Sequence, residues 1–133
     1  MLAPEDFNVV SLPYMKQIAD ALAPHCPVIL FPKGSWYALK DLSETSASGI
    51  GIDWTTNAEY ARRETSNKIT LQGNFDPAKL LLPPAEIKKE VKKMIDAFGA
   101  QRYIANLGHG ITPNVPVENA KAFVEAVKEW QGE

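Results

Sequence analysis

A histidine with a glycine on each side, Gly108-His109-Gly110, is the part of the sequence best suited to chemistry. Glycines let the backbone adopt unusual angles and let a bulky ligand approach closely. An imidazole can donate a hydrogen bond to an anion or move a proton near neutral pH. A histidine that only hydrogen-bonds within a turn is the structural alternative, and the spacing alone does not decide between the two.

Two further charged residues, Lys33 and Asp53, follow apolar segments. Lys33 either faces solvent or contacts a ligand, and the sequence leaves both open. Asp53 is expected to fix a neighbouring loop by accepting hydrogen bonds from backbone N–H groups. His25, beside Cys26, is expected on the surface. The sequence has no phosphate-binding glycine loop, no second cysteine and no His-x-x-x-His, so neither a metal site nor a cofactor is predicted.

These residues are positioned by four short apolar segments, each followed by a helical pattern. Short, nearly continuous apolar runs are typical of strands buried on both faces of a parallel sheet. The carboxyl ends of such strands share one edge, where functional groups gather. That edge is predicted to carry a polar set that also includes Gln72, Asn74 and Asn106. The predicted strands are residues 27–31, 49–53, 69–72 and 103–107.

Helix signals lie between the strands. Thr56 and Glu59 form a capping-box pattern, Pro84 and Pro116 mark helix starts, and Gly99 is a plausible helix end. Helical spacing predicts three buried stripes. They comprise Met15, Ile18, Ala19 and Leu22; then Ile87, Val91, Met94, Ile95 and Phe98; then Ala120, Phe123, Val124 and Val127.

The alternation predicts an α/β fold with a parallel sheet in one domain, residues 1–133. Two architectures remain: a small doubly wound sheet, or half of a (β/α)₈ barrel, since a complete barrel takes about 250 residues.

Composition excludes some classes of function. A net charge of −2 gives no basis for nucleic-acid binding. No apolar run approaches the roughly 20 residues that span a bilayer. A single cysteine, Cys26, indicates a reducing compartment, and we expect the cytoplasm.

Several motifs in order carry a resemblance to one family. They are Phe31-Pro32-Lys33-Gly34, Gly51-Ile52-Asp53-Trp54-Thr55, the stretch 71–77 (LQGNFDP), the stretch 103–110 (YIANLGHG) and the closing segment 116–130. Together they resemble the uroporphyrinogen decarboxylases, and the likeness covers essentially the whole chain.

The resemblance implies a (β/α)₈ barrel, of which this chain would be the C-terminal half, with the last four strands. It implies a homodimeric enzyme that converts the acetate side chains of uroporphyrinogen III to methyls without a cofactor, giving coproporphyrinogen III. It also implies that His109 contacts the substrate, supported by the loop residues Gly108 and Gly110.

Other groups of the family's active site would lie upstream of Met1. We therefore expect a fragment that self-associates or is marginally stable, because half a barrel exposes two sheet edges. One alternative is a non-catalytic fragment that binds a tetrapyrrole or a protein partner. Another is a cobalamin-linked methyltransferase of the same superfamily, which resembles this chain in fold but binds zinc through a His-x-Cys and a distant Cys. Here His25 and Cys26 are adjacent.

Overall fold

Four parallel strands form one sheet in the computed structural model, which describes residues 2–132. The strands are β1 (Ile29–Leu30), β2 (Gly49–Gly51), β3 (Thr70–Phe75) and β4 (Tyr103–Leu107). Each strand pairs with the next along the chain, in the order β1-β2-β3-β4. A doubly wound sheet reverses its strand order at a switch point, whereas a barrel adds each strand beside the last. The sheet is therefore part of a (β/α)₈-type barrel.

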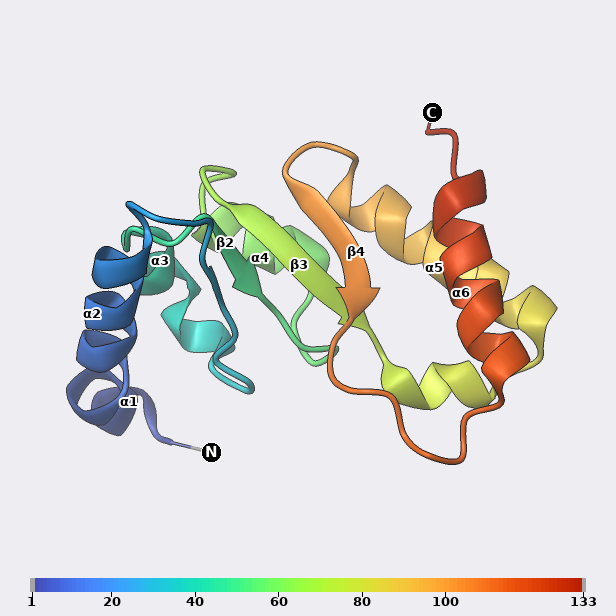
Figure 1. Cartoon of the computed structure of the whole chain (residues 1–133), viewed down its shortest axis with the longest axis horizontal. Coiled ribbons are helices and arrows are strands. Elements are labelled where there is room, and N and C mark those ends of the chain that lie inside the picture. Colours follow the sequence, from blue (N-terminus) through green and yellow to red (C-terminus); the bar gives the residue numbers. More distant parts are fainter. Residues whose placement is uncertain (1, 133) are drawn as a thin grey trace.

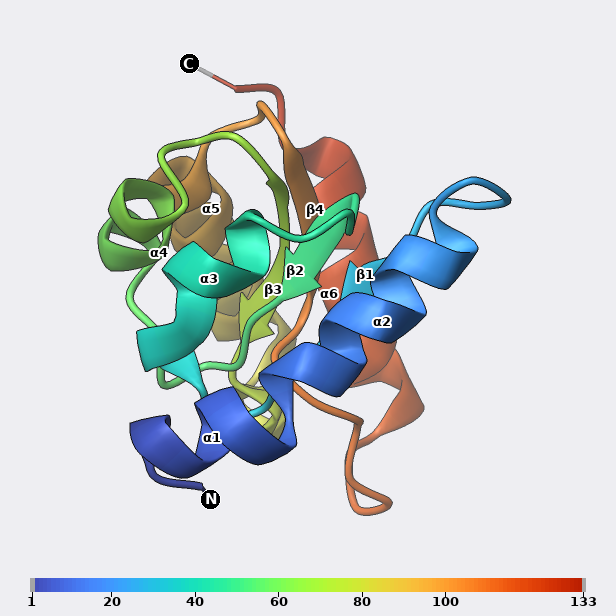
Figure 2. The same cartoon turned by 90° about the vertical axis from the view of Figure 1, so that its left-hand side faces the viewer.

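Helices cover one face of this sheet and flank its two edges. In Figure 1, α4 and α5 lie behind the strands, while α2 and α6 stand at opposite ends. Figure 2 shows α3, α4 and α5 on one side of the curved sheet. The other side is open between α2 and α6. The helices are α1 (Pro4–Val10), α2 (Leu12–Leu22), α3 (Leu39–Ser43), α4 (Ala58–Glu64), α5 (Pro84–Phe98) and α6 (Val117–Glu129), with short 3₁₀ helices η1 (Trp36–Ala38) and η2 (Pro77–Leu81).

The strand predictions are confirmed, with shifted bounds. β4 has the predicted limits, and β3 runs on to Phe75. β1 is only two residues long. Pro27 and Pro32 lie near its two ends, and proline cannot donate a hydrogen bond to a sheet ladder. None of the helices within residues 2–132 has the length and apolar character needed to cross a membrane.

The helix ends combine one correction with two confirmed signals. Asn57, not Thr56, caps α4, and its side-chain oxygen accepts from the Tyr60 N–H at 3.0 Å. α5 begins at Pro84 and has Gly99 as its C-cap, both as predicted. Gly99 has a φ of 72°, which a residue without a Cβ adopts at little cost.

The predicted buried stripe is confirmed in full for α5 and only in part for α2 and α6. All five predicted α5 residues are buried. In α2, Ala19 is buried but Ile18 and Leu22 are 54% and 44% exposed. In α6, Val124 is 49% exposed and Asn119 is buried instead. α2 and α6 each pack against the rest of the molecule along one side only, so part of each apolar stripe remains exposed.

Candidate functional site

The open face of the sheet forms one wall of a cleft of about 670 Å³. The strands contribute Gln72 and Asn106, two members of the predicted polar set, and α6 contributes an apolar wall. Among the lining residues, His109 has the only titratable side chain. The cleft is lined by Ile29, Phe31, Gly51, Ile52, Gln72, Leu80, Asn106, Leu107, His109, Gly110, Ile111, Ala120, Phe123 and Val124.

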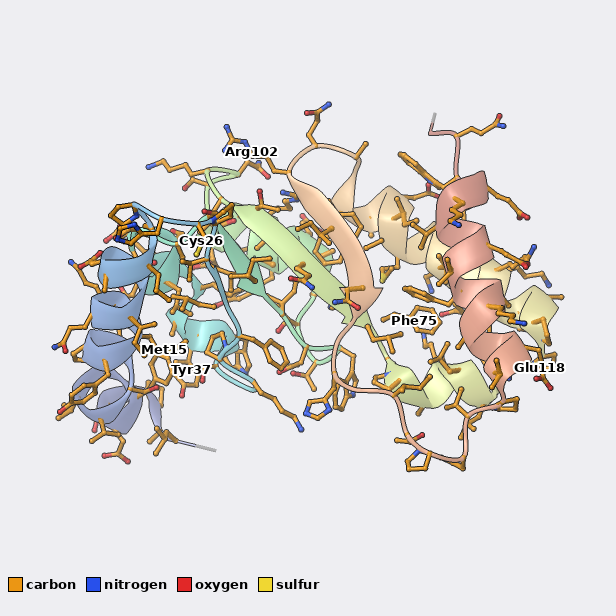
Figure 3. The ribbon with its side chains drawn as sticks, viewed as in Figure 1. Met15, Cys26, Tyr37, Phe75, Arg102 and Glu118 are labelled. Carbon is orange, nitrogen blue, oxygen red and sulfur yellow. The ribbon has the colours of Figure 1, made fainter. Side chains whose placement is uncertain are left out.

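The apolar wall of the cleft was not foreseen. Phe123 of α6 packs against Phe75 at the end of β3, with ring centroids 5.2 Å apart. Figure 3 shows Phe75 at the α6 end of the sheet. The sequence signal was the α6 stripe: Phe123 is buried as predicted and also lines the cleft, whereas Val124 was predicted to be buried and is exposed in the cleft. The site is thus apolar on one side and polar along the strand ends.

His109 lies just after β4, exposed at the mouth of this cleft. Two aromatic rings, one from the loop after β1 and one from the loop after β2, lie near the imidazole of His109. The ring centroid of Phe31 lies 6.3 Å from that of the imidazole. The ring centroid of Trp54 lies 6.4 Å from that of the imidazole, and the planes of these two rings are 88° apart. Three separate strand ends therefore converge on one imidazole, as the positions along the chain predicted.

The two glycines beside His109 have different roles. A Cβ at Gly108 would lie 2.6 Å from the backbone nitrogen of Trp54, and the Gly108 N–H donates to the Phe75 carbonyl at 2.7 Å. Gly108 is therefore required by close packing. At Gly110 a Cβ would meet nothing within 4 Å. Neither glycine has a positive φ, so the left-handed conformation that glycine permits is used at neither position.

Asp53 fixes the two loops next to His109, the structural role expected for it. Its Oδ2 accepts from the Gly34 N–H at 2.6 Å, and its Oδ1 accepts from the Thr55 N–H at 2.9 Å and the Thr55 hydroxyl at 2.5 Å. Burial opposes ionisation of this carboxyl, but these hydrogen bonds, together with the charge of Lys33, hold the pKa of Asp53 below its usual range. One buried carboxylate thus joins the loop after β1 to the loop after β2.

Asn74 was placed in the polar set but does not line the cleft. Its side-chain amide donates to the carbonyls of Asp53 at 3.1 Å and Thr56 at 2.6 Å. It thereby satisfies backbone oxygens of the loop after β2. Asn74 supports that loop, and Gln72 and Asn106 are the amides of the predicted polar set that line the cleft.

Lys33 extends over the indole of Trp54, with its ammonium nitrogen 5.5 Å from the ring centroid. This is a cation–π distance. Trp54 thus contacts Lys33 with its ring and approaches His109 as well. The structure brings Lys33 and His109 to the same aromatic side chain, although they lie 76 positions apart in the sequence (109 − 33).

Metal ligands are not gathered anywhere in the described part of the chain. Within residues 2–132, no group of three or more His, Cys, Asp or Glu side chains could hold a metal ion. His25 is exposed as predicted, and the thiol of Cys26 is free and exposed.

The chain is similar to known proteins over nearly its whole length. Residues 1–130 match the uroporphyrinogen decarboxylase (URO-D) family. Proteins named uroporphyrinogen decarboxylase are 54% identical in Christiangramia forsetii, 53% in Flavobacterium johnsoniae and 42% in Danio rerio. The chain aligns over 98%, 98% and 95% of its own length and spans 38%, 38% and 36% of those relatives.

A solved methyltransferase from Methanosarcina mazei has the same arrangement of elements. Its TM-score is 0.81 over 97% of this chain and 38% of that chain, at 23% sequence identity. This likeness concerns the fold alone. The sequence matches decide the family: the chain belongs to the uroporphyrinogen decarboxylases.

Proposed function

We propose that residues 1–133 form the C-terminal part of a uroporphyrinogen decarboxylase barrel and supply one wall of its active site. The reaction converts the acetate side chains of uroporphyrinogen III to methyls, giving coproporphyrinogen III. The single observation that carries the proposal is the position of His109. It lies at the mouth of an apolar cleft at the carboxyl ends of the strands, beside Phe31 and Trp54.

The chemistry needs proton transfer and no external electron acceptor. Protonation of a pyrrole carbon makes the ring an electron sink, and the bond to the carboxylate then breaks with loss of carbon dioxide. Its electron pair forms an exocyclic double bond, whose carbon is protonated to a methyl as the ring loses its added proton. His109 can donate a hydrogen bond to a substrate carboxylate or carry one of these protons. The proposal therefore includes no cofactor.

Binding without turnover is a second candidate function, favoured by one observation. His109 is the only titratable side chain among the residues that line the cleft. A route with two separate protonations is served better by two proton-transfer groups than by one. In this reading the chain holds a tetrapyrrole against the cleft wall, and the chemistry requires further groups.

We place this function in the cytoplasm. The support is the free, exposed thiol of Cys26, which suits a reducing compartment. Fractionation of cells expressing a tagged chain tests this placement, and recovery of the chain in an oxidising compartment would contradict it.

An anaerobic assay with uroporphyrinogen III separates the two candidates. Loss of carboxyl groups is followed by chromatography of the oxidised porphyrins, and binding by quenching of tryptophan fluorescence with uroporphyrin III. The variants are His109→Ala and, as a matched control, His25→Ala at an exposed site outside the cleft.

Turnover that is lost in His109→Ala and kept in His25→Ala supports the decarboxylase. Binding without turnover, weakened only by His109→Ala, supports the second candidate. A folded protein with neither activity would overturn both.

A further inference from the structure

The loop after β1 presents an ammonium group, that of Lys33, which forms no ion pair with a carboxylate of the described residues. The described residues contain six ion pairs between side chains, and Lys33 belongs to none of them. Its side chain is exposed and lies over Trp54. A lysine that served only solubility would not need ordered backbone beside it. Here a buried carboxylate orders the backbone next to Lys33 and next to Trp54, the aromatic residue that Lys33 contacts.

Asp53 provides that order on both sides. Its Oδ2 accepts from the N–H of Gly34, the residue after Lys33, at 2.6 Å. Its Oδ1 accepts from Thr55, the residue after Trp54, at 2.9 Å. The same side chain is 4% exposed, so it cannot itself contact a large ligand. The carboxylate therefore fixes the backbone beside the lysine and beside the indole at once.

We propose that Lys33 binds a substrate carboxylate next to His109, and that Asp53 is the positioning residue that holds Lys33 there. This inference rests on the proposed function, since it assumes an acidic tetrapyrrole in the cleft. Each pyrrole of that substrate carries two neighbouring carboxylate side chains. Lys33 and His109 lie 5.5 Å and 6.4 Å from the centroid of the same indole, so at most about 12 Å separates the ammonium nitrogen from the imidazole centroid. Two neighbouring carboxylates, with a hydrogen bond at each end, can bridge such a span.

A small probe tests the lysine independently of the tetrapyrrole. The probe is a monopyrrole carrying adjacent acetate and propionate side chains, titrated into the full chain and followed by amide and indole NMR signals. We expect shifts at Gly34, Trp54 and His109, with affinity about tenfold lower in Lys33→Met and restored in large part by Lys33→Arg. Lys40→Met removes the same charge from α3, away from the cleft, and serves as the matched control.

Asp53 is tested by a double-mutant cycle with the same probe. Asp53→Asn is expected to weaken binding in the Lys33 background and to have little further effect in Lys33→Met, because it acts through the lysine. A merely structural aspartate would weaken both backgrounds equally. That equal loss would overturn the positioning role.

A second titration with uroporphyrin III separates failure of this inference from failure of the proposed function. If the probe binds in a way that depends on Lys33 but uroporphyrin does not bind, the proposed function is contradicted, while Lys33 is still shown to bind a carboxylate. Uroporphyrin binding that depends on His109 but not on Lys33 would overturn the inference alone. Absence of probe shifts at Gly34 and Trp54 would also overturn it.

Discussion

Position 108 tolerates no side chain, because the backbone of Asp53 and Trp54 occupies the space where a Cβ would stand. We expect Gly108→Ala to lower the free energy of unfolding by roughly 1–3 kcal/mol, the usual cost of overpacking. It should also displace His109 from the edge of the Trp54 ring and weaken uroporphyrin binding. Urea unfolding and fluorescence titration measure the two effects.

Gly110→Ala is the matched control, since a Cβ there meets nothing within 4 Å and the backbone φ is not positive. Its unfolding free energy should stay within about 0.5 kcal/mol of the unchanged chain. Equal stability of both variants would contradict the close packing of Gly108.

The carboxylate of Asp53 makes stability depend on pH. Because hydrogen bonds and the charge of Lys33 hold the pKa of Asp53 below its unfolded value of about 3.9, this group stabilises the fold above that pH. The contribution is lost as pH falls through the lowered pKa. Asp53→Asn should therefore cost roughly 1–3 kcal/mol at pH 7 and progressively less below about pH 4. Urea unfolding of both proteins between pH 7 and pH 3 measures this, and a difference that stays constant would refute it.

Among the elements, α4 and α5 are joined by one side chain. Arg62 of α4 donates to the Phe98 carbonyl from Nε at 3.1 Å and from Nη2 at 2.9 Å, and to the Gln101 carbonyl at 2.8 Å. These acceptors lie at and just beyond the end of α5, where helix carbonyls lack partners. We expect Arg62→Met to lower the free energy of unfolding by about 1–3 kcal/mol.

Arg63→Met is the control for this change, since Arg63 is exposed and its ion pair is with the adjacent Glu64. Exposed ion pairs contribute little, so this variant should change stability by less than about 1 kcal/mol. Thermal and urea unfolding of the two variants give the comparison. Similar losses at both positions would show that Arg62 does not connect the helices.

The elements also show how far sequence reasoning reaches. The strand and helix periods and the convergence of strand ends on His109 were predictable, because local patterns and a shared sheet edge determine them. The burial of Asn119 was not, because its amide donates to the Leu80 and Leu82 carbonyls at 2.7 Å and 3.0 Å, and those partners lie far away in sequence. The position of Lys33 over Trp54 likewise could not be predicted, because no sequence spacing encodes that contact.

At the scale of the whole molecule, exposed apolar residues gather on the side where no helix covers the sheet and on the two flanking helices. Ile29, Phe31 and Ile104 are 42%, 44% and 41% exposed on the strands or just beyond them. On α2, Tyr14, Ile18 and Leu22 follow a four-residue spacing, which places them on one side of the helix. Such a distribution marks surfaces that bury themselves against another chain or segment.

Self-association is the prediction that follows from these surfaces and from the free edge of β4. An exposed edge strand offers unpaired N–H and carbonyl groups to a second copy. We expect the weight-average mass in sedimentation equilibrium to rise with concentration. Ile104→Lys should raise the dissociation constant about tenfold, a change of roughly 1.4 kcal/mol, because a charge on the edge disfavours pairing. Ala97→Lys adds the same charge on α5, which lies behind the sheet, and should leave association unchanged. A constant monomer mass at all concentrations, with cooperative unfolding at high temperature, would show that these surfaces are stable in solvent without a second copy.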